Sequence, residues 1–333
     1  MSETMVLSRQ RQGRSFNLRG FTMRYGVIVL LALVIASLAF TMPNFFDPSN
    51  IRLMLRGIGI SALMFLGLTW VIASGKIDIS FMDCAALTTM VCATVVAGGH
   101  GWLAGCLAGL ATGVVLGTLN GLLVGYAGLP PLITTIATGS LARSLAWILG
   151  SGASLPLSGP DGFVHAFIGT DLGVVPLLTI ATVAIYALAW FVQDRLTFGR
   201  YLYALERNER AVIEAGLSAR GLTLSLFVFS GVCASLAGVL LTANLNSGQP
   251  ALGASYFLDG LTAVLLGAIV VKVGKANVIG TLVGVVFLAV LVSVGAMLGW
   301  QNYVREIIKG MVLLIGVIAI FTLKRRRQHG LAR

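Results

Sequence analysis

Long apolar stretches follow one another along nearly the whole chain, and they constrain its fold more than any other feature. A helix that crosses a bilayer needs roughly 17–25 mainly apolar residues. Ten stretches fit this description, of which the eighth is the shortest and least sharply bounded. They cover residues 25–42, 55–73, 79–98, 102–125, 131–150, 174–193, 222–243, 257–272, 276–298 and 304–323. The sequence therefore predicts an all-α integral membrane protein with about ten transmembrane helices, some of them broken.

Composition supports the membrane class and argues against several others. Hydrophobic residues make up 57% of the chain and charged residues 11%, whereas soluble domains are about 25% charged. The four cysteines lie inside apolar stretches, which indicates buried side chains and no disulfide or metal framework. No G-x-x-x-x-G-K-S/T phosphate loop occurs, and the three histidines form no constellation with cysteines or carboxylates. We therefore expect no catalytic site, no metal site and no cofactor in this chain.

The distribution of basic residues predicts the orientation. With the N-terminus in the cytoplasm, most of the 23 Lys and Arg residues fall on the inner side, as the positive-inside rule requires. Arg52, Arg56, Arg305 and Lys309 fall on the outer side, and Arg143 falls within a span. The net charge of +11 is therefore explained by topology, and nucleic acid is not an expected partner. The expected organisation is a basic cytoplasmic tail (1–24), a transmembrane domain (25–323) and a second basic cytoplasmic tail (324–333).

One inner segment is unlike the stretches around it. Residues 194–221 carry five arginines and several acidic residues, Glu206, Glu209 and Glu214 among them. A charged, helix-forming loop of this length suits a polar, reversible interface. We interpret it as a coupling loop that docks a soluble ATPase, so that the chain is a permease driven from outside itself. The alternatives are a solvated loop that only sets topology and, for the whole chain, a stand-alone ion-coupled secondary transporter.

Glycines recur every four residues along the fourth stretch. They are Gly101, Gly105, Gly109, Gly113, Gly117, Gly121 and Gly125. Small residues at this spacing let helix backbones approach closely in lipid. The ridge predicts close packing against a neighbouring helix, with lining of a solute pathway as the alternative.

Polar residues interrupt the apolar pattern between the second and third stretches. Ser74, Lys76, Asp78 and Ser80 surround Gly75, which would let a helix break there. Broken backbone at membrane depth is found where it lines a cavity that is enclosed by protein or filled with water. We interpret these residues as part of a translocation pathway or gate, with a plain interfacial loop as the alternative.

Further polar residues lie inside the apolar stretches themselves. Arg143 needs an acidic or carbonyl partner at this depth, and the sequence leaves both Asp83 and Asp259 open as that partner. An asparagine in the fourth stretch suits either a hydroxylated solute or a hydrogen bond between helices. The additional pathway candidates are Asn120, Thr134, Thr135, Arg143 and Asp259.

Several motifs together resemble one family, the monosaccharide ABC importer permeases of the ribose, arabinose, xylose, galactose and autoinducer-2 type. Ser74-Gly-Lys-Ile-Asp-Ile-Ser is similar to that family's S-G-G-I-D-L/I-S segment. Ile133-Thr-Thr-Ile-Ala-Thr-Gly with Arg143 resembles its A-T-L-G-T segment and following Arg. Thr197-Phe-Gly-Arg-Tyr-Leu-Tyr-Ala, with Asn208 and Ala215-Gly-Leu, resembles T-x-x-G-R-x-x-Y-A-x-G-G-N and S-G-I/V. Ala263-Val-Leu-Leu-Gly and Ile279-Gly-Thr-Leu-Val-Gly resemble A-V-V-L-G-G and G-T-x-x-G, so the resemblance covers about residues 43–320.

The resemblance implies a type II ABC importer permease in the bacterial inner membrane, with ten spans, for a sugar or sugar-like polyol. The partners it implies are a cytoplasmic ABC ATPase that binds Mg-ATP, a periplasmic solute-binding protein, membrane lipid, and a second copy or a related permease. It also implies that the coupling loop contributes the short helix that seats in the ATPase. The residues expected there are Gly199, Arg200, Asn208, Glu209, Arg210 and Gly216.

This chain departs from the family pattern at several glycines. Lys76 and Met82 replace glycines, and Glu206-Arg207 stands where the family has Gly-Gly. Gly267-Ala268 and Val273-Gly-Lys-Ala stand where Gly-Gly and G-G-x-G are expected. Two hypotheses follow: a heterodimer with a more typical permease, or an unusual solute whose acidic group is attracted by Lys76.

Overall fold

The structure, a computed structural model, describes residues 18–158 and 162–330, with side chains over 25–158 and 162–318. Every apolar stretch predicted from the sequence coincides with a helix. These helices are α1 (Leu18–Thr41), α2 (Pro48–Ala73), α3 (Phe81–Val95), α4 (Gly101–Gly125), α5 (Pro131–Leu149), α7 (Leu177–Arg195), α10 (Ala219–Leu245), α11 (Gly253–Gly267), α12 (Val278–Met297) and α13 (Asn302–Gly330). The predicted tails lie partly outside the described residues, and α13 continues past the predicted span end at residue 323.

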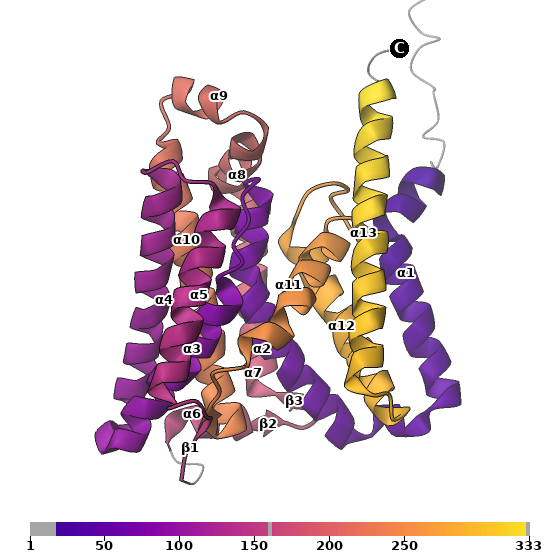
Figure 1. Ribbon diagram of the computed structural model, residues 1–333. Helices are drawn as coiled ribbons and strands as arrows, with labels where there is room; N and C mark the ends of the chain where they lie inside the picture. The colour runs from indigo at the N-terminus through magenta and orange to yellow at the C-terminus, as the bar shows by residue number, and fades with distance from the viewer. Residues whose placement is uncertain (1–17, 159–161, 331–333) are drawn as a thin grey trace, which may run out of the picture.

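Shorter elements connect these helices. They are η2 (Pro43–Phe46), η3 (Val96–His100), α6 (Phe163–Gly169), α8 (Thr197–Arg207), α9 (Glu209–Glu214), β1 (Leu155–Pro156), β2 (Asp171–Leu172), β3 (Val175–Pro176) and β4 (Ser247–Gly248). Figure 1 shows the long helices side by side, with α8 and α9 at one end of the bundle and the short strands at the other. The start of α1 and the end of α13 lie at the same end as α8 and α9 (Figure 1).

Within the described residues, six helical units are long and apolar enough to cross a membrane, namely α2, α3 with α4, α5, α7, α10 and α12. Residues Tyr25–Thr41 of α1, and α11, are shorter apolar helices. The chain is therefore a multi-pass, helical membrane protein, as predicted. Its helix lengths alone do not establish ten crossings.

The 45-residue unit Phe81–Gly125 consists of two antiparallel helices. The chain reverses at η3, where Gly99 and Gly101 adopt φ angles of +83° and +78°. Glycine tolerates this left-handed region, which other residues rarely adopt. Beyond the turn, Gly109 of α4 faces Thr88 of α3, so the two helices pack along each other.

The glycine ridge of α4 is a packing surface against α10, which confirms the packing interpretation. A Cβ at Gly113 would overlap the carbonyl oxygen of Gly231, and a Cβ at Gly117 would lie 2.5 Å from the carbonyl oxygen of Phe227. A Cβ at Gly121 would lie 2.6 Å from the Leu224 side chain. Because the backbones are in direct contact here, these positions leave no room for a side chain.

The connection between α2 and α3 is a non-helical segment that turns back into the bundle. α2 ends at Ala73, Gly75 adopts a φ of +79°, and α3 begins only at Phe81. Asp78 and Ser80, in between, are both 2% exposed. The predicted third span therefore has an extended entrance before its helix, which is the kind of break that the glycine indicated.

Candidate functional site

The coupling loop predicted over 194–221 contains two helices, α8 and α9, in which apolar side chains are buried and charged side chains are exposed. Leu202 and Leu205 of α8 and Val212 of α9 are buried against the bundle. The charged candidates Arg200, Glu209 and Arg210 are exposed. The three buried side chains thus attach α8 and α9 to the membrane domain. The charged side chains of the two helices are exposed and accessible to a partner.

Three of the predicted coupling residues shape this loop. Gly199 stands where any Cβ would overlap the carbonyl oxygen of Gln193, so it permits the tight corner between α7 and α8. Asn208 separates α8 from α9, and its Oδ1 accepts a hydrogen bond from the Ala211 N–H at 3.2 Å, as an N-cap residue does. Gly216 follows α9 with a φ of +79°.

The coupling loop contacts the α2–α3 connection directly. The Lys76 ammonium lies 3.5 Å from the Glu209 carboxylate, and only 12% of the Lys76 side chain is exposed. A Cβ at Gly75 would lie 3.2 Å from the Glu206 Cα. Phe198 of α8 also packs on Trp70 near the end of α2, with ring centroids 5.0 Å apart. Lys76, predicted at the pathway, is therefore placed at the coupling loop.

A second contact joins the coupling region to the loop 268–277 between α11 and α12. Lys272 forms an ion pair with Asp194, and the Tyr203 hydroxyl donates to the Ala276 carbonyl oxygen at 3.0 Å. Burial raises the pKa of Tyr203, so its hydroxyl stays protonated and remains a donor. The ammonium of Lys275 lies 4.4 Å from the centre of the Tyr203 ring. A displacement of α8 would therefore be transmitted to both the α2–α3 connection and the loop 268–277.

The inner end of the α2–α3 connection belongs to a buried hydrogen-bond network. Asp78 Oδ1 accepts from the Ser80 hydroxyl at 2.6 Å, and Asp78 Oδ2 accepts from the Ser230 hydroxyl of α10 at 2.7 Å. The Asn120 amide donates to the Ser80 hydroxyl at 2.8 Å and accepts from the Thr138 hydroxyl at 2.6 Å. The network joins α4, α5 and α10 to the break, so these groups are already hydrogen-bonded to one another.

The two threonine candidates of α5 have local partners. The hydroxyl of Thr135 donates to the Pro131 carbonyl oxygen and accepts from the Ile79 N–H at 3.1 Å, which anchors α5 to the break. The Thr134 hydroxyl donates to the Pro130 carbonyl oxygen. Ser74 likewise donates to a backbone oxygen, that of Val71. Of the three, only Thr135 contacts another element, and the bonds of Thr134 and Ser74 stay within their own helix ends.

Arg143 pairs with Asp83, which decides between its two candidate partners. Both contacts, from Nε to Oδ1 and from a terminal nitrogen to Oδ2, are 2.8 Å long. Such a two-pronged contact is the strongest arrangement for an arginine and a carboxylate. Asp83 is 3% exposed at its side chain, whereas Arg143 is 47% exposed. The pair links α3 to α5 across their interface.

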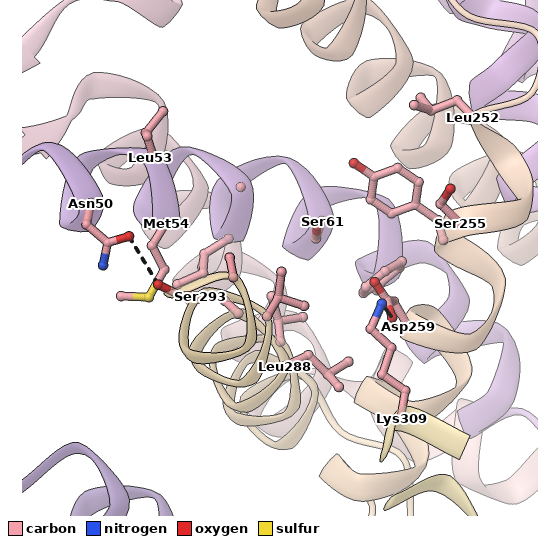
Figure 2. Close-up of a pocket in the computed structure, with 18 residues that line it drawn as sticks. Asn50, Leu53, Met54, Ser61, Leu252, Ser255, Asp259, Leu288, Ser293 and Lys309 are labelled. Carbon is pink, nitrogen blue, oxygen red and sulfur yellow. Dashed lines mark hydrogen bonds and ion pairs between the residues drawn. The ribbon is translucent and has the colours of Figure 1, made fainter. Parts of the chain in front are cut away.

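Asp259 lies instead on α11, beside a cavity of about 450 Å³ between α2, α11, α12 and α13. Its carboxylate is 2.7 Å from the Lys309 ammonium, which also lies 3.1 Å from Glu306. Figure 2 shows this pair at one side of the cavity and the hydrogen-bonded Asn50 and Ser293 at the other. Leu53 and Met54 line the cavity near the Asn50–Ser293 pair, and Leu288 lies between the two pairs (Figure 2).

Sequence reasoning did not predict the burial of Lys309. Lys309 is 6% exposed and lies inside the bundle. The available signal was the Glu306–Lys309 spacing, which places two opposite charges on one face of a helix just before its apolar stretch 310–323. This arrangement is typical of paired charges. Single hydroxyls such as Ser61 and Tyr256, which also line the cavity, carry no comparable signal.

Comparison with known proteins shows similarity along almost the whole chain. The profile of a family described as "branched-chain amino acid transport system / permease component" matches residues 50–317. The ribose import permease protein of Bacillus subtilis (strain 168) is 31% identical over 310 residues, which is 93% of this chain and 96% of the relative. The D-allose transport system permease protein of Escherichia coli (strain K12) is 28% identical over 316 residues, or 94% and 96% of the two chains. No solved structure is significantly similar.

Proposed function

This chain belongs to the family of transport-system permease components described above, and we propose that it forms the solute path of an ABC importer for a monosaccharide. A permease subunit of this family lacks an ATPase site, so the chain is not an enzyme. Its partners in import are an ATPase and a solute-binding protein.

A sugar is the solute class that the relatives support. Full-length relatives are permeases for ribose, D-allose and L-arabinose, at 31%, 28% and 29% identity in the examples from Bacillus subtilis and Escherichia coli. The chain covers at least 89% of each of these three relatives. This shared length supports a shared transport mechanism, while the sequence differences leave room for a different sugar.

The observation that carries the proposal is the two-sided character of the coupling loop. Its charged side chains are exposed, and its apolar side chains are buried against the membrane helices. A separate ATPase that closes on ATP would push on α8 and α9 and, through them, on the α2–α3 connection and the loop 268–277. Alternating access would then follow from energy supplied outside this chain.

The proposed topology has ten crossings and a cytoplasmic coupling loop. α3 and α4 count as two crossings because they are antiparallel, and α1, α11 and α13 complete the ten. Both termini would be cytoplasmic, since the described ends of α1 and α13 lie at the α8–α9 end of the bundle (Figure 1). The partner in the membrane would be a second copy or a related permease.

The experiment that tests this function is uptake by the complete importer. The chain would be expressed with its ATPase and binding protein in a strain without other pentose and hexose importers, and labelled D-ribose, D-allose and L-arabinose would be supplied. We expect ATP-dependent uptake of at least one sugar, and its loss when α8 and α9 (197–214) are replaced by a Gly/Ser linker. The same linker should abolish co-purification of the ATPase.

A stand-alone secondary transporter makes the opposite prediction. Reconstituted without partners, such a protein would accumulate sugar when an ion gradient is imposed and would ignore ATP. That result would contradict the proposed function. Co-purification of a second, different permease would decide in favour of a heterodimer over a homodimer.

A further inference from the structure

We propose that the cavity between α2, α11, α12 and α13 is a contact site for an uncharged polyhydroxylated solute. The contacts would come from the hydroxyls of Ser61, Ser255 and Tyr256 and from the Asp259–Lys309 pair. This inference rests on the proposed function, and it assigns the solute contacts to particular groups of this chain.

The hydroxyl groups are the first reason. Ser61, Ser255 and Tyr256 line the cavity, and no hydrogen bond joins their side chains to another residue of the described chain. On the same helix as Ser61, the buried Thr69 behaves differently, because its hydroxyl donates to the Phe65 carbonyl oxygen at 2.7 Å. Polar groups without partners are costly within a bilayer. A hydroxyl-rich occupant would satisfy all three.

The ion pair is the second reason. The Lys309 ammonium is directed at Asp259 from α13, and its side chain is only 7% exposed. A carboxylate has several acceptor positions and an ammonium has three donors, so each retains capacity beyond their shared contact. Sugar hydroxyls can donate to one and accept from the other. The Lys309 ammonium also lies 3.1 Å from Glu306, so two carboxylates surround one ammonium. The resulting net negative charge disfavours an acid and leaves an uncharged polyol as the better occupant.

The shape of the cavity is the third reason. Its volume of about 450 Å³ lies within the range of about 300–1,000 Å³ that is usual for small-molecule sites. Ser61 lies between the Asn50–Ser293 pair and the Asp259–Lys309 pair, and Ser255 lies near the Asp259–Lys309 pair (Figure 2). Apolar residues complete the walls, so the contacts with a sugar would be few. Few contacts suit a transport path, where a solute must also leave.

Occupancy can be measured with a cysteine introduced into the cavity. Ser255→Cys would be made in the complete importer, in membrane vesicles, and treated with a polar maleimide while the importer turns over ATP. D-ribose, D-allose and L-arabinose are the probes, and the wild type gives the labelling background. We expect the transported sugar to slow labelling at least three-fold. Ser154→Cys, at an exposed position in the connection after α5, is the matched control and should label at the same rate with or without sugar.

Hydroxyl deletions provide the second measurement. Tyr256→Phe and Ser61→Ala remove one hydroxyl each and retain the packing. Loss of one hydrogen bond to solute corresponds to about a five-fold effect, so we expect each variant to lower uptake at saturating sugar by about that factor. We also expect the ratio of ribose to arabinose uptake to change. A purely structural role would leave that ratio constant, and Ser144→Ala should leave both quantities unchanged.

The outcomes separate the two proposals. Normal uptake in Tyr256→Phe and Ser61→Ala, or labelling of Ser255→Cys that sugar does not slow, would overturn the cavity assignment while leaving the importer function standing. Labelling by an apolar maleimide but not by a polar one would show a lipid-filled groove and would also overturn it. Failure of the wild-type importer to take up any of the three sugars would refute the proposed function, and the cavity assignment with it.

Discussion

The α3–α4–α5–α10 side of the bundle and the α11–α12–α13 side use polar residues in opposite ways. On the first side, Asp78, Ser80, Asn120 and Thr138 hydrogen-bond to one another. On the second side, the hydroxyls of Ser61, Ser255 and Tyr256 line a cavity without a hydrogen-bond partner in the described part of the chain, and a buried ion pair lies at its edge. We call these the sealed side and the open side.

The difference shows what a polar residue in a membrane helix indicates. Its presence alone does not mark a solute path, because the same residue types make the sealed side rigid. Under the proposed cavity assignment, a path is distinguished by hydrogen-bonding groups that the protein leaves unpaired. The coupling loop contacts both sides, through Lys76 and through Lys272. Under the proposed mechanism, a push on this loop would reach both sides.

The largest effect is expected from breaking the sealed side at its glycine contact. Gly113→Ala would drive a methyl group into the Gly231 carbonyl oxygen and the Ser235 side chain, and should lower the free energy of unfolding by about 3 kcal/mol. Thermal unfolding of the purified protein measures this. Gly57→Ala is the matched control, because a Cβ at Gly57 meets nothing within 4 Å. Equal stability of the two variants would show that the α4–α10 contact is not tight.

The next effect concerns the ion pair of the sealed side. Arg143→Met would leave Asp83 buried without its partner and should lower stability by about 2 kcal/mol, a value reduced from that of fully buried pairs because Arg143 is half-exposed. Arg143→Met combined with Asp83→Asn should recover part of the loss, as measured by thermal unfolding. A double variant that is less stable than Arg143→Met would contradict a pairwise role.

A smaller effect on stability compares a hydroxyl of the sealed side with a hydroxyl of the open side. Thr138→Val removes a hydroxyl that bonds to Asn120 and should lower stability by about 1 kcal/mol. Ser61→Ala removes a hydroxyl of the open side that has no described partner. This variant should therefore lose less stability than Thr138→Val. Denaturation in mild detergent measures both variants. The comparison would fail if Ser61→Ala were the more damaging of the two.

The smallest effect is expected at the coupling contact. Lys76→Gly, which restores the family residue, should lower uptake per ATP by about two-fold, because an ion pair that is exposed on one side contributes at most about 1 kcal/mol. Exchanging the charges, Lys76→Glu with Glu209→Lys, should restore the ratio. Parallel uptake and ATPase assays give the amount of sugar taken up per ATP hydrolysed. Loss of uptake of acidic solutes alone would favour the alternative that Lys76 attracts the solute.

Much of the fold follows from the sequence because it depends on local composition. Apolar length located all ten helices, and the spacing of Gly113, Gly117 and Gly121 predicted a tight helix contact. Gly75 correctly indicated a break before α3. The charge of residues 194–221 indicated a helical loop, although only the structure shows that Asn208 divides it into two helices.

The sequence by itself determined the class of protein, the positions of its helices and the list of polar residues inside them. The tertiary structure decided which of those residues meet. It paired Arg143 with Asp83, directed Lys76 at Glu209, and brought Lys309 from the end of the chain to Asp259. The physical reason is that composition and periodicity report the burial of a single helix. The partner of a buried charge depends on which helix faces it, and that is set by packing between segments far apart in the chain.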